Sequence, residues 1–265
     1  MRSLIVSTAL LAAGATPAPA AVVSQGVFRM GADALWTDAS PGAGQAVAIV
    51  DEGFGGLDAS IAAGELPPRE AMTLRSFDPV NGLDGRDGLE APTQHGTRMA
   101  ELVHDVAPGA RLVLVNYHDV PQFARAADWV ASEGIPVVSH SNSFLDGPFD
   151  GTGPAARAVD AAAARGVLWV NSAGNFAQRH WEGVAPPGGA AVPFTVGPAG
   201  ATLDMHASWA DPGASATLVL ERQEPDGTWT RRGQGASSGP VSVRVGPLPA
   251  DAGAWRAVVT QTAGA

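Results

Sequence analysis

The feature that most constrains the fold of this chain is a regular alternation of short apolar runs and helix-like segments over residues 45–171. Short apolar runs bounded by turn residues are typical of buried strands, whereas apolar residues at helical spacing and Ala-rich stretches indicate helices. We expect strands at 45–50, 111–117, 135–139 and 167–170, and helices at 95–106, 121–133 and 153–165. This alternation predicts an α/β fold with a doubly wound, mostly parallel sheet, in which functional groups lie at the carboxyl ends of the strands.

Two other regions differ in composition from this alternating one. Residues 58–94 contain Pro67-Pro68 and a Gly- and Asp-rich segment at 81–88, so we expect mainly loops there. Beyond residue 193, short runs with Thr, Val and Trp are separated by Gly, Pro and Asp, as in antiparallel strands. We therefore predict an α/β domain over 21–192, followed over 193–265 by a smaller antiparallel β-rich insertion or second domain.

The N-terminal segment has the composition of a secretory signal peptide. Met1 and Arg2 precede an apolar run at 4–15, and small residues and prolines follow up to Ala20. Because this run is too short to span a bilayer, we expect a signal peptide over 1–20 rather than an anchor. The predicted location is secreted or periplasmic, with no membrane partner.

Composition narrows the classes of function further. The chain has no cysteine, which excludes a disulfide scaffold, a thiolate metal site and a cysteine nucleophile. Its net charge of −10 argues against a nucleic-acid partner, since such proteins usually carry clustered basic residues. The densest basic spot, Arg231 and Arg232 beside Trp229, is interpreted as a solvated strand edge.

Three segments place polar residues at the ends or starts of the predicted elements. A-V-A-I-V-D-E-G-F (46–54) puts Asp51 at the end of a buried strand, and V-L-W-V-N-S-A-G-N (167–175) delivers Asn175 to the same edge of the sheet. H-G-T-R-M-A-E-L-V-H-D-V-A-P-G-A (95–110) opens a helix with His95, and Gly96 allows close approach of neighbouring backbone. Taken singly, these residues also fit a turn-capping Asp, an ordinary His and a simple turn.

Together and in this order, the three segments resemble the subtilase family, the subtilisin-like serine peptidases, over roughly residues 45–176. The resemblance implies that Asp51 orients His95, that His95 takes the proton of a serine, and that Asn175 donates a hydrogen bond to the oxyanion. It also implies that Ser141, Asn142 and Ser143 form a substrate-binding strand edge, with an ordinary strand end as the alternative. The implied partner is a peptide or protein substrate, and the implied activity is that of a serine endopeptidase.

The family's nucleophile, in a Gly-Thr-Ser-Met-Ala-Ala-Pro segment that opens a helix, is not found in this sequence. The nearest string, at 235–240, lies among strand-like residues. We therefore expect an incomplete catalytic domain that is inactive alone, either because the chain stops before the serine, which we favour, or because the nucleophile has been lost. A non-catalytic, subtilase-like peptide-binding protein is the alternative. The glycines at 53, 55 and 56 suggest a nucleotide site only weakly, because the dinucleotide fingerprint is incomplete.

No metal or other cofactor is predicted. The histidines other than His95 lack metal-ligand spacing, and we interpret them as structural: His104, His118, His140, His180 and His206. Asp84 and Asp87 lie in a Gly-rich loop that could hold Ca²⁺, as in many subtilases. Because the loop lacks an EF-hand arrangement, a plain surface loop is the favoured interpretation.

Overall fold

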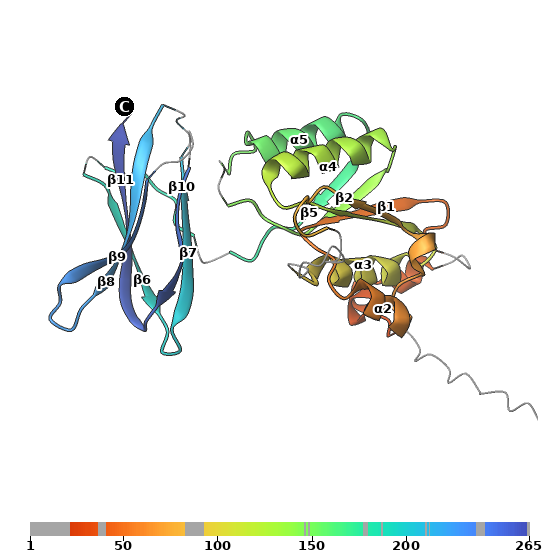
Figure 1. The fold of residues 1–265 in the computed structure, drawn as a ribbon, viewed down its shortest axis with the longest axis horizontal. Coiled ribbons are helices and arrows are strands. Elements are labelled where there is room, and N and C mark those ends of the chain that lie inside the picture. The colour runs from red at the N-terminus through yellow and green to blue at the C-terminus, as the bar shows by residue number, and fades with distance from the viewer. Residues whose placement is uncertain are drawn as a thin grey trace, which may run out of the picture.

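The computed structural model describes residues 22–36, 41–82, 93–145, 147, 149–176, 180–186, 188–209, 211, 213–236 and 242–263. The predicted signal peptide over 1–20 and the loop with Asp84 and Asp87 lie outside these residues. Within them, the chain forms an α/β part and a β-rich part, as Figure 1 shows. No helix of the described residues is long and apolar enough to cross a membrane.

The α/β part is built on a five-stranded sheet with the order β2-β3-β1-β4-β5. All of its neighbouring strands run parallel, which confirms the predicted fold class. The strands are β1 (Ala46–Asp51), β2 (Thr73–Ser76), β3 (Arg111–Asn116), β4 (Val137–His140) and β5 (Leu168–Asn171).

Helices cover both faces of this sheet (Figure 1). On one face lie α2 (Leu57–Ala63) and α3 (His95–Val106), and on the other lie α4 (Val120–Ser132) and α5 (Pro154–Ala163). Shorter helical segments are α1 (Gln25–Arg29), η1 (Ala32–Leu35) and η2 (Arg69–Ala71). The start of α4 follows from its sequence, because the Asp119 side chain accepts a hydrogen bond from the Gln122 amide and Pro121 occupies the first turn.

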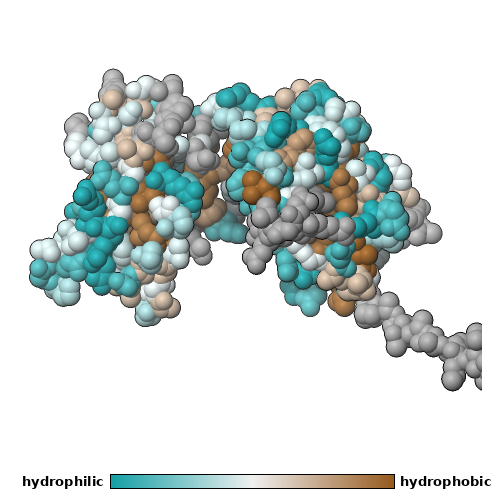
Figure 2. All heavy atoms as spheres, in the orientation of Figure 1, coloured by the Kyte–Doolittle hydropathy of each residue, from teal (hydrophilic) through white to brown (hydrophobic). Residues whose placement is uncertain are grey.

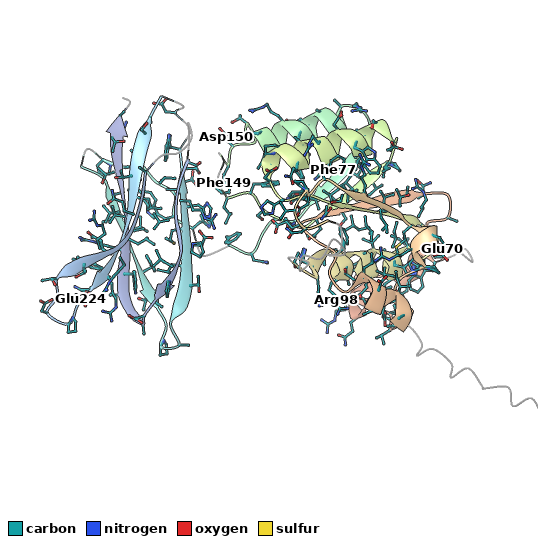
Figure 3. The ribbon with its side chains drawn as sticks, in the orientation of Figure 1. Glu70, Phe77, Arg98, Phe149, Asp150 and Glu224 are labelled. Carbon is teal, nitrogen blue, oxygen red and sulfur yellow. The ribbon has the colours of Figure 1, made fainter. Side chains whose placement is uncertain are left out.

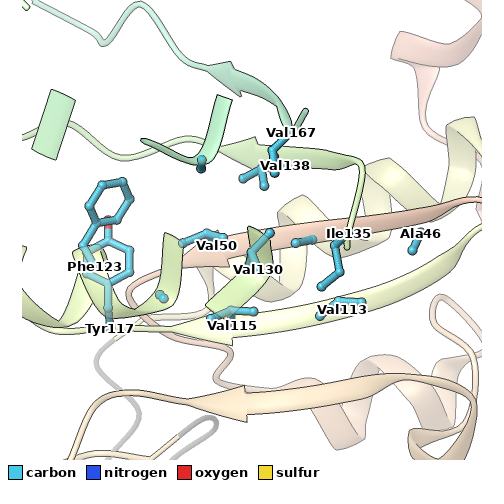
Figure 4. Packing of buried hydrophobic residues seen from close by; sticks show 13 residues of the cluster. Ala46, Val50, Val113, Val115, Tyr117, Phe123, Val130, Ile135, Val138 and Val167 are labelled. Atoms are coloured by element: carbon cyan, nitrogen blue, oxygen red, sulfur yellow. The ribbon is translucent and has the colours of Figure 1, made fainter. Parts of the chain in front are cut away.

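A separate hydrophobic cluster lies on each face of the sheet. Val50 and Val138 pack with Phe123 and Val130 of α4 on one face (Figure 4). Ile49, the neighbour of Val50 in β1, packs into the other cluster, under α2 and α3. The central strand β1 is thus buried on both sides, which explains why its sequence is continuously apolar rather than alternating.

The β-rich part consists of two antiparallel sheets with the orders β6-β11-β8-β9 and β10-β7. Side chains fill the space between the sheets, as Figure 3 shows, with Leu218 and Leu220 of β8 packing against Val243 and Val245 of β10. The strands are β6 (Ala190–Val196), β7 (Ala201–Ser208), β8 (Ser215–Gln223), β9 (Trp229–Ala236), β10 (Ser242–Ala250) and β11 (Gly253–Ala263). On the face of the molecule in Figure 2, hydrophilic residues are spread over both parts of the chain.

The structure differs from the sequence-based expectation at two edge strands. The region predicted to be loops contains α2 and β2, and β2 has the mixed sequence T-L-R-S because it pairs only with β3. The first strand of the β-rich part, β6, begins at Ala190, before the predicted boundary at 193. Pro193 lies inside β6, where it is tolerated because β6 is an edge strand that pairs only with β11.

Candidate active site

An acid–imidazole pair forms where the end of β1 meets the start of α3. The carboxylate of Asp51 is 1% exposed, and its Oδ2 lies 2.7 Å from Nδ1 of His95. The other carboxylate oxygen, Oδ1, accepts a hydrogen bond of 2.9 Å from the backbone N–H of Glu52. The His95 side chain is 41% exposed, so one side of its ring faces the acid and the other faces solvent.

The hydrogen-bond partners determine which ring nitrogen of His95 carries the proton. An ionised carboxylate only accepts hydrogen bonds, so Nδ1 of the neutral imidazole must be the donor toward Asp51. Nε2 then has a free lone pair, and within the described residues no group hydrogen-bonds to it. An imidazole held in this way can act as a general base toward a group placed near Nε2.

The sequence His-Gly-Thr is required by the close contact between α3 and the turn after β1. A Cβ on Gly96 would lie 2.6 Å from the Gly53 carbonyl oxygen and 2.9 Å from Cβ of Asp51, which no real side chain tolerates. The Gly96 N–H donates to that same carbonyl, and the buried Thr97 hydroxyl donates to the Gly55 carbonyl at 2.9 Å. These contacts hold the first turn of α3, and with it His95, against Asp51.

Thr93 also contributes to this junction, and the sequence did not single it out. Its hydroxyl accepts a hydrogen bond of 3.0 Å from the backbone N–H of His95, and its carbonyl accepts one of 2.8 Å from Gly55. Thr93 precedes the N-cap residue Gln94. A Thr hydroxyl often accepts from a backbone N–H two residues on, and a Thr at this place before a helix is the signal that would have found it. Thr93 therefore ties the helix start to the Gly-rich turn from a second direction.

A cleft of about 470 Å³ lies over the carboxyl ends of β1, β4 and β5. It brings together the predicted residues His95, Ser141, Asn142, Ser143 and Asn175, and Asp51 lies behind His95. The other lining residues are Glu52, Met99, Ser172, Ala173, Gly174 and Phe176. Residues from three distant segments thus meet at one edge of the sheet, as expected for a parallel α/β fold.

The segment after β5 carries Asn175 into this cleft. Asn175 is exposed, and its side-chain amide has no hydrogen bond with any described residue, so it can bind a ligand. Gly174 adopts φ +76°, a left-handed conformation that favours glycine, and a Cβ there would lie 3.1 Å from Oγ of Ser143. The glycine therefore lets the Asn175 segment approach the one that follows β4.

Residues 141–143 continue the chain beyond β4 and leave its sheet. Their backbone groups make no hydrogen bonds with other described residues, so they are open to an added strand. The side chain of Asn142 turns away from such a strand, because its Nδ2 donates to the Tyr117 hydroxyl at 3.2 Å. A bound peptide would therefore meet Asn142 through its backbone.

Glu52 is a further group in the cleft that the sequence did not single out. Its carboxyl group lines the cleft beside His95. Desolvation in the cleft raises the pKa of Glu52, and the neighbouring Asp51 carboxylate raises it further. The cleft therefore has an acidic side next to the imidazole.

A metal site, a phosphate site and a second serine segment are the other candidates that the sequence raises. The described residues contain no group of three or more acidic and histidine side chains placed to hold a metal ion, and the loop with Asp84 and Asp87 is not among them. In the Gly-rich turn, the N–H of Gly55 is already bonded to Thr93, so it is not available to a phosphate. The rejected serine string at 235–240 begins at the end of β9, and β10 follows it.

Comparison of the chain with models of known protein families gives no match, and comparison with curated proteins gives none either. The functional conclusion therefore depends on the geometry of the cleft and on the motifs that build it.

Proposed function

We propose that this chain supplies the acid, the base and the oxyanion donor of a secreted serine endopeptidase of the subtilisin type. The observation that carries the proposal is the 2.7 Å contact between Asp51 and His95 at the edge of a cleft that also contains Asn175. A peptide substrate would lie along residues 141–143, whose backbone groups make no hydrogen bonds with other described residues.

Each of these groups has a defined task in acyl transfer. A serine hydroxyl is a weak nucleophile until a base takes its proton, and Nε2 of His95 is oriented to do so. Asp51 holds the required tautomer of His95 and stabilises the imidazolium that forms. The amide of Asn175 would donate to the oxyanion, and loss of one such donor costs about 2.7–4 kcal/mol of activation free energy, a magnitude known from subtilisin itself.

The sequence does not contain the serine segment that this mechanism requires. We therefore expect the 265-residue chain alone to hydrolyse no protein substrate and to resist labelling by serine-directed phosphonates. Stable labelling of any serine in this chain would contradict the assignment, because it would reveal a nucleophile elsewhere.

The decisive test is the coding sequence that follows codon 265 in the source DNA. A reading frame that continues into a Gly-Thr-Ser helix supports the proposal, and the longer protein can then be assayed. In it, His95→Ala should lower kcat by a factor on the order of 10⁴–10⁶, because the base is lost. His206→Ala, in the β-rich part, is the matched control and should leave kcat unchanged. Near-normal turnover by His95→Ala would remove His95 from the mechanism.

The backbone of residues 141–143, which makes no hydrogen bonds within the described part of the chain, also supports a second candidate, a non-catalytic peptide-binding protein. A stop codon directly after codon 265, together with measurable binding of extended peptides, would favour this candidate over the peptidase. Binding would be measured by the shift of backbone amide resonances at residues 141–143.

A further inference from the structure

A chain of hydrogen bonds lies next to the cleft, with the half-buried Asn142 at one end and the exposed Asn171 at the other. Its centre is His140, the last residue of β4. His140 is only 2% exposed. Its Nε2 lies 2.9 Å from the Tyr117 hydroxyl oxygen, and its Nδ1 is hydrogen-bonded to Oδ1 of Asn171. The Tyr117 hydroxyl in turn lies 3.2 Å from Nδ2 of Asn142. Four side chains from three strand ends are thus joined in one line.

The donors and acceptors in this line have a single consistent direction. The Asn171 amide is oriented by its Nδ2, which donates to the Ser172 carbonyl at 2.9 Å, so its Oδ1 must accept. Nδ1 of His140 therefore carries the proton, and Nε2 accepts from the Tyr117 hydroxyl. The Tyr117 oxygen then accepts from Asn142. The two buried members, His140 and Tyr117, thus have partners for all their side-chain polar atoms, which avoids a large desolvation cost.

The surroundings keep this network neutral. Burial lowers the pKa of His140 and raises the pKa of Tyr117, which disfavours both charged forms. The aromatic neighbours of the His140 ring are Phe123 at 4.9 Å, Phe144 at 5.9 Å and Trp169 at 5.9 Å between centroids. Two ionisable groups act on the pKa of His140: the Asp51 carboxylate raises it, and the His95 side chain lowers it.

The network connects the two cleft segments that the proposed function uses. At one end, Asn142 belongs to the segment over residues 141–143, and at the other end Asn171 directly precedes the segment over residues 172–176. The His140 carbonyl also accepts a backbone hydrogen bond of 3.0 Å from Ser172. Both segments are therefore attached to the same residue, through its side chain and its backbone.

We infer that His140 is a positioning residue that, through Tyr117 and Asn171, sets the placement of residues 141–143 relative to the Asn175 segment. The inference deepens the proposed function and rests on it, because these segments are the proposed peptide and oxyanion sites. Placement matters there, since a displacement of about 1 Å can cost about a hundredfold in rate.

The test is nuclear magnetic resonance of the whole chain with ¹⁵N-labelled histidine, in mildly alkaline buffer. In the wild type, the ring nitrogens of His140 should show a protonated Nδ1 and a hydrogen-bonded, unprotonated Nε2. Tyr117→Phe should shift the Nε2 resonance and speed hydrogen exchange of the Ser172 amide about tenfold, because one support of the network is removed. Ile135→Val, a buried change in the same core, is the control and should leave both signals unchanged.

A second pair of variants separates positioning from simple stability. Asn171→Asp keeps an acceptor for Nδ1 of His140, so the His140 Nε2 resonance and the exchange rate of the Ser172 amide should stay as in the wild type. Asn171→Leu removes this acceptor, so both should change. A wild-type spectrum with the proton on Nε2 would overturn the inference. Unchanged His140 and Ser172 signals in both Tyr117→Phe and Asn171→Leu would overturn it as well.

The proposed function is tested separately in the same samples by titration with acetyl-tetraalanine amide. Shifts at residues 141–143 in the wild type support peptide binding, and Tyr117→Phe should then bind about tenfold more weakly, while Ile135→Val binds normally. The absence of wild-type shifts would count against peptide binding, whereas the tautomer and the exchange of Ser172 would still decide the role of His140.

Discussion

The two parts of the molecule differ in what they bury. In the α/β part, the fully buried side chains include Asp51, Thr97, Asn116 and His140. In the β-rich part, every buried side chain among the described residues is hydrophobic. Burial of a polar group costs free energy unless its partners are in place. The α/β part provides such partners beside the cleft, as at Asp51 and His140, and in a loop, as at Asp78. The described residues of the β-rich part instead bury a hydrophobic core alone.

Several charged groups in the β-rich part instead form ion pairs that are exposed or half-buried. Arg244 pairs with Asp204 at 2.6 Å, and Arg256 pairs with Glu221 at the same distance. Pairs of this exposure typically contribute only about 0–1 kcal/mol each. They therefore add little to the free energy of unfolding, which in this part depends on the packing between its two sheets.

The largest expected effect on stability comes from a substitution that creates a cavity in the hydrophobic core of one part only. Leu220→Ala, at a fully buried position in β8, should lower the stability of the β-rich part by about 2–5 kcal/mol, because it leaves a cavity. Hydrogen exchange resolved by residue should show faster opening of β8 and β11, with exchange in β1 and α3 unchanged. Leu114→Ala, equally buried in β3, is the matched control and should reverse the pattern. Equal loss of protection in both parts would show that they unfold as one unit.

A smaller but more local effect is expected at the junction between α3 and the turn after β1. Gly96→Ala should cost about 1–3 kcal/mol, since its Cβ would overlap the Gly53 carbonyl and Asp51. It should also abolish the strongly deshielded Nδ1 proton resonance of His95 that a short bond to Asp51 produces.

The matched control for this change is Gly197→Ala, where a Cβ has no neighbour within 4 Å. It should alter stability by no more than about 0.5 kcal/mol and leave the His95 proton in place. A normal His95 resonance in Gly96→Ala would mean that the close approach is not what holds the pair together.

Acid should destabilise the α/β part before the β-rich part. Because burial lowers the pKa of His140 below its ordinary value of 6.5, the unfolded chain takes up a proton first. The contribution of His140 to the free energy of unfolding is therefore fully present above pH 6.5. It falls as the pH drops toward the pKa of the folded state, by up to about 1.4 kcal/mol per pH unit for one proton. Burial lowers the pKa of His104, also in this part, in the same direction.

The β-rich part should respond only in stronger acid. There the hydrogen bond from Arg244 lowers the pKa of Asp204 below its ordinary value of 3.8, so this contribution is lost only as the pH falls below that value. Exchange measured for each part over a series of pH values checks the order. Simultaneous loss of protection in both parts near neutral pH would contradict it.

Much of the fold and of the site could be predicted from local patterns. The apolar run that ends at Asp51 and the Gly that follows His95 reflect constraints that act over a few residues, namely burial on both faces and a close backbone approach. Two edge strands were harder to predict. β2 has the mixed sequence T-L-R-S, which gives no apolar pattern, and Pro193 inside β6 resembled a boundary.

The sequence by itself determined the strands β1, β3, β4 and β5 and the helices α3, α4 and α5, and therefore that Asp51, His95 and Asn175 come to one edge of a parallel sheet. Only the tertiary structure decided the role of His140, whose partners Tyr117 and Asn171 lie 23 and 31 residues away. The physical reason is that a periodic pattern reports which face of an element is buried. It does not report which polar group of another strand lies opposite that face, because a hydrogen bond depends on the register of strands that are distant in the chain.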